Sequence, residues 1–590
     1  MTVVRCPVRS LPTLQKLGSA VDPNVDPQAI TNAWFAHFVD AMSSKDVVGV
    51  LDLLVDGAFW RDMLALTWDF HTYEGKDTVK RFLTDQLPKF NLSAFKLRED
   101  LVRLDKPFED LAWIQGFFNF DTTVGHASGI FRLVPLADGS WKAHVVYTNL
   151  DNLRGFPEKN GPLRNHELNH GKWAKMRERE WEFQDEEPCV VIVGGGQSGF
   201  LSNQKWTEIV VIAKLFEGYE HMPYLPFPSS WPVFTPSLKM ADWLESYAQS
   251  LELNVWTSAS VISVEPGTKG KKWSVRVVRD DGRERIFGVN HIVFAMGFGS
   301  GKPNVPNIPG QDEFKGQILH SSQHKVATDH LGRKVAVIGS CISAHDICSD
   351  YVEHGVDVTM VQRGPTYVMS SKEDLPRILG GLYNEDGPPT DLADRISASF
   401  LNHLVQLLHQ RVAKDIAEAD KDTLDGLRKV GFKLTFGEDG SGVMSLLWSR
   451  FGGYYLDVGA SQKIIDEKIK LKSDGPIARF TSTGLLFEDG STLDADVVLF
   501  ATGDQSLSPK LHSQGDTRES YLRLLPKDLH DAVLPAWGLN EEGEIYAQWR
   551  EIGGRGPEGP IAVCRFHSKH IAMQPSSGEY VPTIYLRNVH

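Results

Sequence analysis

The stretch "VVIVGGGQSGF", residues 190–200, begins as a run of β-branched residues and ends in a glycine-rich turn. Gly194, Gly196 and Gly199 have the G-x-G-x-x-G spacing of a dinucleotide-binding loop. In such a loop the first glycine permits the tight turn, the second lets a pyrophosphate approach the backbone, and the third lets the helix pack closely on the strand. A plain turn between a strand and a helix is the alternative, because glycine-rich turns are common. The residues predicted to bind the dinucleotide are Gly194, Gly196, Gln197, Ser198 and Gly199.

A second strand and loop of the same kind, "KVAVIGSCISAHDICSD", occupies residues 334–350. Serine and alanine replace two of the glycines here, and they still leave small side chains where a phosphate must come close. The strand that follows, "VDVTMVQR", ends in Arg363. An arginine at this place favours NADP over NAD because it can bind the 2′-phosphate, although a surface arginine is the alternative. The residues predicted to bind NADPH are Gly339, Ser340, Ser343, Ala344 and Arg363.

Two further strands end in glycine-containing turns, at Met296-Gly297 and at Thr502-Gly503. Between the first of these strands and the second loop lies "FKGQILHSSQH", residues 314–324. It contains an F-x-G-x-x-x-H pattern formed by Phe314, Gly316 and His320. These motifs occur in a defined order, and together they are more specific than any one of them.

The chain from about Pro188 to Arg565 resembles the class B flavoprotein monooxygenases, the flavin-containing monooxygenase and YUCCA-like group, in a fungal subtype. The resemblance implies an α/β fold of two nested Rossmann-like domains, in which an FAD domain is interrupted by an NADPH domain. It implies that Thr502 and Gly503 approach the flavin. It also implies that NADPH reduces the flavin, that a flavin C4a-hydroperoxide forms with O2, and that this peroxide transfers one oxygen atom to a small organic substrate.

The resemblance also bears on the reaction type and on the catalytic residues. Baeyer-Villiger enzymes of this class usually end the fingerprint in Trp, whereas this chain has His324, which favours N- or S-oxygenation or oxidative decarboxylation. For His320 and His324 we favour a hinge role, hydrogen-bonding the linker between domains, over an acid-base role. Because the cofactor performs the difficult chemistry, no catalytic side chain is assigned.

The chain in front of these motifs has a different pattern. Residues 32–64 place apolar side chains three and four apart, and they are predicted to be helical, as are residues 75–87. Residues 112–123, 128–136 and 141–150 are predicted to be antiparallel strands, with "ADGS" as a hairpin turn. Helices followed by strands predict an α+β cone, and the segment resembles the SnoaL-like, NTF2-like family.

Such cones form pockets, and several polar and aromatic residues are candidates to line one. We favour a core role for the aromatic residues, because aromatic side chains dominate core burial. The sequence suggests no partner for His71. The candidates are Trp60, Asp62, Trp68, His71 and Tyr73.

The predicted domain organisation follows from these motifs. The chain begins with a flexible lead-in (1–27), an NTF2-like domain (28–150) and a charged linker (151–187). The FAD domain is predicted in two stretches, 188–330 and 496–590, and the second of them includes a divergent C-terminus. The NADPH domain with an insertion lies between these stretches, at 331–495.

The chain departs from the family in two places. The return strand "EIVVIAK", 208–214, ends without the acidic residue that holds the ribose, and the flavin-covering segment expected before His221 is missing. The chain from 548 onward also lacks the expected apolar turn. Two explanations stay open: an impaired homologue that acts at most as an NADPH-binding or partner protein, or a faulty gene model.

Composition limits the classes of partner. The formal charge of -14 disfavours nucleic acid or an anionic membrane as the main partner. The five cysteines are scattered, which favours a reducing compartment and no metal site, and there is no run of apolar residues long enough to span a membrane. We therefore expect a cytoplasmic protein, possible homodimer formation, FAD and NADPH as cofactors, and no metal.

Overall fold

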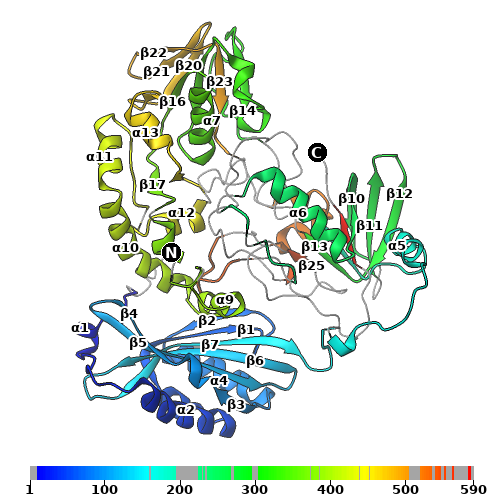
Figure 1. Ribbon diagram of the computed structural model, residues 1–590, viewed down its shortest axis with the longest axis vertical. Coiled ribbons are helices and arrows are strands. Elements are labelled where there is room, and N and C mark those ends of the chain that lie inside the picture. Colours follow the sequence, from blue (N-terminus) through cyan, green and yellow to red (C-terminus); the bar gives the residue numbers. More distant parts are fainter. Residues whose placement is uncertain are drawn as a thin grey trace.

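The structure is a computed structural model in which the chain forms three lobes (Figure 1). The N-terminal domain lies at the bottom of that view, the unit with the second glycine loop at the top, and the unit with the first glycine loop at the right. The described residues are 9–158, 161–194, 224–228, 230–232, 235–267, 272–294, 303–372, 374–379, 381–384, 386–437, 439–450, 452–503, 518–533, 538–546, 551–552, 561–563 and 583–586.

The N-terminal domain is a mixed sheet with helices on one face. Its strands are β1 (Leu54–Met63), β2 (Phe70–Glu74), β3 (Ser93–Leu97), β4 (Arg103–Phe108), β5 (Leu111–Asp121), β6 (Gly125–Pro135) and β7 (Trp141–Leu153). They follow the order β2-β1-β7-β6-β5-β3, with β4 also paired to β5, and the β1–β7 pair alone is parallel among them. Its helices are α1 (Leu14–Leu17), α2 (Pro27–Ser44), α3 (Val47–Asp52) and α4 (Lys76–Gln86).

Two predictions for this region are wrong. Residues 54–63 form strand β1 instead of a helix, because β1 is paired on both sides, by β2 and by β7, and tertiary pairing overrides the local apolar spacing. The lead-in is not free from residue 9 onward, since Leu11 is buried and the N–H of Leu14 donates to the carbonyl of Asp110 at 2.8 Å. The helix predicted at 75–87 and the three later strands are confirmed.

The inner face of this sheet is filled by aromatic side chains. Trp60 is fully buried, and its indole N–H donates to the hydroxyl of Thr148 at 3.1 Å. Phe38 from α2 lies 5.6 Å from Phe118 of β5, ring centroid to ring centroid. Aromatic burial of this kind is a large share of the packing energy of a small domain. The favoured core role is therefore confirmed for Trp60.

The unit with the second glycine loop is a parallel sheet. Its strands are β14 (Gln317–His320), β15 (Lys334–Ile338), β16 (Asp357–Val361), β19 (Lys470–Lys472) and β23 (Val497–Phe500), in the order β14-β23-β15-β16-β19. Helix α7 (Ile342–Glu353) connects β15 to β16. All four strand pairs are parallel, and buried Val, Ile, Leu and Phe side chains on both faces match the continuous apolar runs of these strands. The Rossmann-like α/β fold is thus present.

Two of these strands lie outside the predicted boundaries of the NADPH domain. The sequence-based boundaries assign β14 and β23 to the FAD domain, at 188–330 and 496–590, but these strands pair with each other and β23 pairs with β15. The parallel sheet therefore needs residues from both sides of the predicted boundaries.

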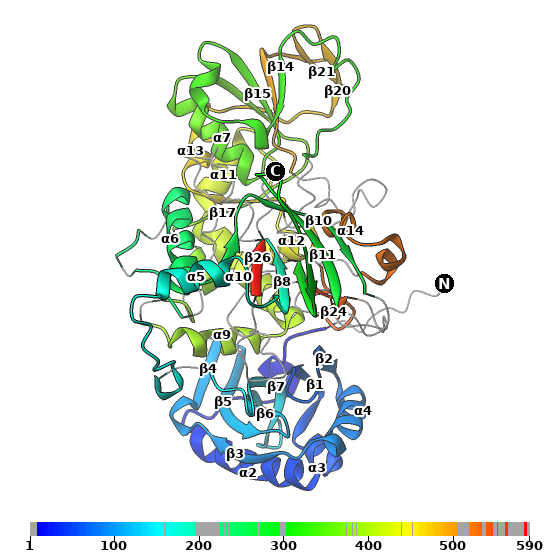
Figure 2. The same ribbon diagram turned by 90° about the vertical axis from the view of Figure 1, so that its right-hand side faces the viewer.

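A large insertion and a small sheet interrupt this unit. The insertion contains β17 (Tyr367–Ser370), α8 (Leu375–Leu379), α9 (Thr390–Ala398), α10 (Asn402–Ala419), α11 (Lys421–Lys429), α12 (Val443–Arg450), β18 (Tyr454–Asp457) and α13 (Ala460–Ile465). The small sheet contains β20 (Ile477–Thr481), β21 (Gly484–Phe487) and β22 (Thr492–Asp494). In both ribbon views α9 lies against the N-terminal domain (Figures 1 and 2).

The unit with the first glycine loop is a six-stranded sheet with the order β24-β25-β13-β8-β26-β9. It contains β8 (Val190–Val193), β9 (Asn254–Trp256), β13 (His291–Phe294), β24 (Glu551–Ile552), β25 (Ile561–Val563) and β26 (Thr583–Leu586). A three-stranded sheet of β10 (Ala259–Glu265), β11 (Trp273–Arg279) and β12 (Glu284–Val289) belongs to the same lobe, with α6 (Ser237–Ser250). Helix α5 (Trp173–Trp181) lies in the linker, which is mostly exposed from 161 to 181.

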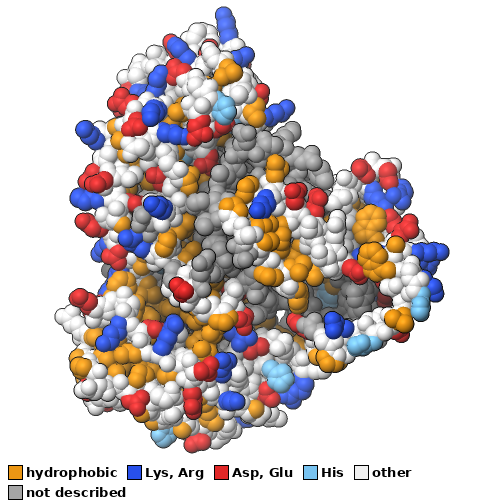
Figure 3. Space-filling view, in the orientation of Figure 1, with side chains coloured by type: hydrophobic (Ala, Val, Ile, Leu, Met, Phe, Trp, Pro, Cys, Tyr) orange, Lys and Arg blue, Asp and Glu red, His pale blue; other side chains and the backbone are white. Residues whose placement is uncertain are grey.

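The described surface is mixed in charge. Lys and Arg side chains are interspersed with Asp and Glu side chains over the visible face (Figure 3). Among the described helices, none combines the length and the apolar character needed to cross a membrane.

Candidate functional site

The second glycine loop is a tight turn that glycine alone can make. Gly339 follows β15 with a φ of +138°, and its N–H donates to the carbonyl of Val361 at 3.0 Å. A Cβ atom at this position would lie 2.5 Å from the carbonyl oxygen of Ala501. Both the backbone angle and the close approach of β23 therefore exclude a side chain. The loop is consequently held at the carboxyl edge of the parallel sheet.

Ser340 has a structural contact that the sequence did not suggest. Its side chain is buried, and its hydroxyl lies 2.8 Å from the hydroxyl of Thr366, which in turn donates to the carbonyl of Ser340 at 2.9 Å. The hydroxyl that was predicted to bind NADPH therefore holds the turn together.

Helix α7 presents its N-terminus to this loop. Its N-cap residue, Cys341, makes no side-chain capping hydrogen bond, and the first N–H groups of any helix have no partner within the helix. Such a helix start is favourable for an anion. Ser343 is exposed in the first turn, and Ala344 is completely buried against the sheet.

Arg363 lies at the same edge of the sheet as the glycine loop. Ile338 and Val361, the last residues of β15 and β16, are register partners, so the residues that follow both strands leave at one level. Arg363 itself is exposed. Its neighbour Gln362 is buried and fixed by two hydrogen bonds with the backbone of Lys433, at 2.7 and 2.9 Å.

The fingerprint residues lie where the segment that leads into β14 crosses the segment that follows β23. The Nε2 atom of His320 is 3.1 Å from the carbonyl oxygen of Gly503, and the N–H of Asn304 donates to that same oxygen at 2.9 Å. The side-chain amide of Asn304 donates to the carbonyl of Thr502 at 3.2 Å, and the Thr502 hydroxyl donates to the carbonyl of Asn304. The predicted hinge role of His320 agrees with this geometry.

Phe314 and Gly316 support that crossing. The ring of Phe314 lies 5.5 Å from the ring of Phe480. A Cβ atom on Gly316 would lie 2.4 Å from the carbonyl oxygen of Asp496, so the linker and the start of β23 can approach each other only at glycine. These two residues therefore position the linker.

His324 belongs to a buried polar chain under α7. The hydroxyl of Tyr351 lies 2.7 Å from Nδ1 of His330 and 3.2 Å from Nδ1 of His324. The other nitrogen of His324 is 3.8 Å from the Asp350 carboxylate, and that of His330 is 3.3 Å from the amide oxygen of Gln317. Burial, and after it the charge of His324, lowers the pKa of His330. This chain of hydrogen bonds ties the segment after His320 to α7.

The first glycine loop is described only at its start. Gly194 follows β8 with a φ of +117°, as the first glycine of such a loop requires. Gly196, Gln197, Ser198, Gly199 and the predicted return strand 208–214 lie outside the described residues. Beside β8, on the side away from β13, the described residues place β26 in parallel, with Thr583 opposite Val190.

The polar candidates of the N-terminal domain have separate roles. Asp62 is fully buried and accepts hydrogen bonds from Thr148, Thr67 and the N–H of Leu66. Burial raises the pKa of Asp62 to about 6, although these bonds oppose the shift.

The two remaining aromatic candidates differ in burial. Trp68 is 66% exposed, which excludes it from the core, and the ring of Tyr73 stacks on the ring of Phe82 with 4.1 Å between the centroids.

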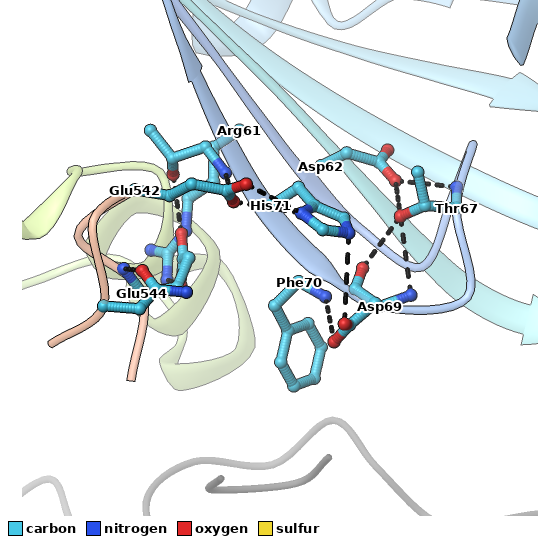
Figure 4. Close-up of polar contacts among 10 residues, drawn as sticks. Arg61, Asp62, Thr67, Asp69, Phe70, His71, Glu542 and Glu544 are labelled. Carbon is cyan, nitrogen blue, oxygen red and sulfur yellow. Dashed lines mark hydrogen bonds and ion pairs between the residues drawn. The ribbon is translucent and has the colours of Figure 1, made fainter. Parts of the chain in front are cut away.

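His71 contacts a segment more than 400 positions away. Its Nδ1 atom lies 3.0 Å from the carboxylate of Glu542 (Figure 4). Next to it, Glu544 is paired with Arg61. Sequence reasoning missed both glutamates and Arg61, because nothing in the local pattern of 538–546 signals a partner so distant in the chain.

The comparisons with known proteins concern the larger portion of the chain. A family model described as FMO-like, flavin-binding monooxygenase-like, matches residues 210–542, which is more than half of the chain. Indole-3-pyruvate monooxygenase YUCCA4 of Oryza sativa subsp. japonica is 28% identical over 299 residues, covering 49% of this chain and 62% of that protein. YUCCA1 of the same plant is 28% identical over 349 residues, covering 56% of this chain and 79% of that protein.

Other similar proteins include dimethylaniline monooxygenase [N-oxide-forming] 2 of Cavia porcellus, 25% identical with 53% of this chain and 56% of that protein covered. Among solved structures, a flavin-containing monooxygenase from Stenotrophomonas maltophilia has 17% identity and a TM-score of 0.37, covering 63% of this chain and 89% of that chain. The closed structure of cyclohexanone monooxygenase has 17% identity and a TM-score of 0.38, covering 58% and 75%.

Proposed function

Because the chain belongs to the FMO-like family of flavin-binding monooxygenases, we propose that it is an FAD- and NADPH-dependent monooxygenase. It would transfer one oxygen atom from O2 to a small organic substrate. The observation that carries the proposal is the second glycine loop, where β15, Gly339 and the start of α7 form a strand, turn and helix with Arg363 at the same edge.

NADPH fits the groups at this edge. The N–H groups in the first turn of α7 would bind the pyrophosphate, since a helix N-terminus favours anions. The buried Ala344 lets the helix lie close to the sheet, and Arg363 would pair with the 2′-phosphate. The hydroxyl of Ser340 is used by Thr366, so Ser340 would contribute through its backbone.

FAD would be held by the loop that begins at Gly194, with Thr502 and Gly503 approaching it from the linker. When bound, the two cofactors supply hydride transfer and oxygen activation. The chain itself would orient them, because His320 and Asn304 clasp Thr502 and Gly503 where one dinucleotide unit passes to the other. No side chain is proposed as an acid or base.

For the reaction we propose N- or S-oxygenation, or oxidative decarboxylation of a 2-oxo acid. The names of the relatives support these classes, since the rice proteins are indole-3-pyruvate monooxygenases and the Cavia porcellus protein is N-oxide-forming. His324 at the end of the fingerprint agrees with the same classes.

Several finer features stay proposals. We propose that residues 28–150 are an NTF2-like domain, which the helices packed on one face of a mixed sheet support. The fungal subtype, a homodimer and a cytoplasmic location also stay predictions. We further propose a role in secondary metabolism, which the resemblance to a fungal subtype implies.

The first test is the flavin. The purified protein should be yellow, and NADPH should bleach its flavin absorbance under anaerobic conditions. A colourless protein that still binds NADPH would support the alternative, an impaired homologue that acts as an NADPH-binding or partner protein.

The second test is the choice of nucleotide. Arg363→Ala should weaken NADPH binding by about 10-fold or more and leave NADH binding nearly unchanged, because the lost group is a charged donor to a phosphate that NADH lacks. The matched control is Arg333→Ala, an exposed arginine just before the other end of β15. Equal weakening of both nucleotides would refute the assignment of Arg363. Calorimetric titration measures both.

A further inference from the structure

The outer face of the N-terminal sheet is covered by other segments of the same chain. Both ribbon views show α9 against this domain (Figures 1 and 2). Leu401 and Leu404 of this region are buried in one cluster with Phe59 and Trp113 of the sheet. Ile396 of α9 is buried in a second cluster, with Phe117, Ile130 and Tyr147. The outer face therefore buries apolar side chains against the insertion.

A buried ion pair lies at the centre of this contact. The guanidinium of Arg61 donates to both carboxylate oxygens of Glu544, at 2.7 and 2.6 Å, and to the carbonyl of Ala398 at 2.5 Å. The hydroxyl of Thr72 donates to the same carboxylate at 2.6 Å. Burial acts to lower the pKa of Arg61, but the charge and hydrogen bonds of Glu544 outweigh it and leave the pKa raised. Both charges are thus fully compensated within the interface.

A second arginine binds the insertion through neutral groups. Arg132 is buried, and it donates to the carbonyl of Ser399 at 3.1 Å and to its hydroxyl at 2.8 Å. Its guanidinium carbon lies 3.8 Å from the centroid of the Phe400 ring. Burial lowers the pKa of Arg132 to about 9, so the side chain is still a cation at neutral pH. Cation–π contact and neutral acceptors replace a counter-charge.

The hairpin that carries Glu544 is held from both sides. The carboxylate of Glu542 accepts from the N–H of Thr72 at 3.2 Å and lies beside His71 (Figure 4). From the insertion, the side-chain amide of Asn402 donates to the carbonyl of Gly543 at 2.7 Å. The N-terminal domain, the insertion and residues 538–546 therefore meet as one packed body.

The covalent connection contributes little to this contact. Residues 163–172 are exposed, and the hydrogen bonds described for them are local, such as those of Arg164 and His166 to residues 161 and 162. Separating the domain from these segments would expose apolar area and a buried charge. This free-energy cost therefore holds the interface together without help from the linker.

We infer that the N-terminal domain is a built-in subunit, whose outer sheet face is a docking surface for α9, α10 and the hairpin 538–546 of its own chain. The docking surface recognises the Glu544 carboxylate of the hairpin together with the apolar side chains of α9 and α10. The domain positions the hairpin relative to the insertion, and it does not need the linker to stay bound. This inference is independent of the proposed oxygenase activity.

The test is to cut the linker of the full chain. A specific protease site placed within 164–170 is cleaved in the otherwise intact protein, and the products are run on a sizing column at micromolar concentration. The two fragments should elute together and separate only in denaturant. Separation of the unsubstituted fragments in native buffer would overturn the inference.

Variants of the hairpin make the test specific. Glu544→Lys places a cation against Arg61 and should weaken fragment association by at least about 100-fold, because an unpaired buried charge costs several kcal/mol. Glu541→Lys makes the same charge change at an exposed position of the same hairpin and should leave association unchanged. Glu544→Gln, which keeps an acceptor, should be intermediate.

Uncut protein guards against misfolding as an explanation. The uncut Glu541→Lys and Glu544→Gln chains should retain the circular dichroism of the unsubstituted chain. The inference would be wrong if the cut Glu544→Lys and Glu544→Gln chains held together as tightly as the Glu541→Lys control.

Discussion

The molecule has two kinds of internal boundary, and they are built differently. The N-terminal domain meets the rest of the chain through buried charged side chains and two apolar clusters. Among the described residues, the two dinucleotide units meet through linkers, where His320 and Asn304 bind the carbonyls of Thr502 and Gly503. Opening the first boundary costs a large free energy, because apolar area and charge are uncovered together. Within the described part of the chain, opening the second boundary breaks a few hydrogen bonds.

This difference suggests which regions move. Each hydrogen bond of the linker crossing contributes only about 0.5–1.5 kcal/mol net, so a rotation about Thr502 and Gly503 breaks only weak contacts among the described residues. The polar chain from His324 to Tyr351 anchors the segment after the hinge to α7. We therefore expect the N-terminal domain and the insertion to move as one body, and the two dinucleotide units to rotate against each other.

The largest effect should come from breaking the buried ion pair on one side. Arg61→Met should lower the free energy of unfolding by about 3–5 kcal/mol, because it leaves the Glu544 carboxylate buried without a counter-charge. The double variant Arg61→Met with Glu544→Met should recover most of this loss, since apolar side chains can replace a buried pair. Thermal and denaturant melting measure both. A double variant as unstable as the single one would contradict the explanation.

A smaller loss is expected at the second interface arginine. Arg132→Met removes the hydrogen bonds to Ser399, which should cost about 1–3 kcal/mol, and it leaves no carboxylate unpaired among its described contacts. Arg103→Met, at an exposed position of β4, is the matched control and should change the stability by less than about 0.5 kcal/mol. If Arg132→Met were as harmful as Arg61→Met, the contrast between charge pairing and neutral acceptors would fail.

The hinge should respond locally. His320→Ala removes the bond to the carbonyl of Gly503, with an expected loss of about 1 kcal/mol. Amide hydrogen exchange should become faster at the N–H of Asn304, which donates to the same oxygen, while exchange in β5 and β6 stays unchanged. Mass spectrometry of peptides from both regions checks this. Faster exchange throughout the N-terminal domain would show that the two boundaries are not independent.

A pH-dependent effect is expected at a buried carboxylate pair in the insertion. Asp374 and Asp420 both accept from the N–H of Ser370, at 2.9 and 2.6 Å. Burial, and after it the neighbouring Asp420, raises the pKa of Asp374. The folded state therefore keeps a proton that the unfolded chain releases. The contribution of Asp374 to the free energy of unfolding therefore decreases as pH rises above the usual carboxyl range.

Asp374→Asn removes that titration and keeps an acceptor for Ser370. Its melting temperature relative to the unsubstituted chain should therefore increase as pH rises from about 4 toward 8. Melting at a series of pH values checks the slope. A difference that does not change with pH would contradict the raised pKa of Asp374. Asp425→Asn, at an exposed position of α11, provides the control.

Local patterns predicted the elements of the fold whose cause is local. The turn at Gly339 follows from a backbone angle that only glycine adopts readily. The strands 111–121, 125–135 and 141–153 follow from runs rich in β-forming residues. Strand β1 was missed, because Trp60 and its neighbours have helix-like apolar spacing and become a strand only between β2 and β7.

By itself, the sequence determined the two glycine loops, the fingerprint and the family, since each is visible in the order of residues along the chain. Only the tertiary structure decided the partners of Arg61 and His71, which lie 483 and 471 positions away, and the use of the Ser340 hydroxyl inside the turn. The physical reason is that a glycine's conformational freedom acts on its own peptide bonds. A buried charge, in contrast, is satisfied by whichever chain segment folding brings within about 3 Å.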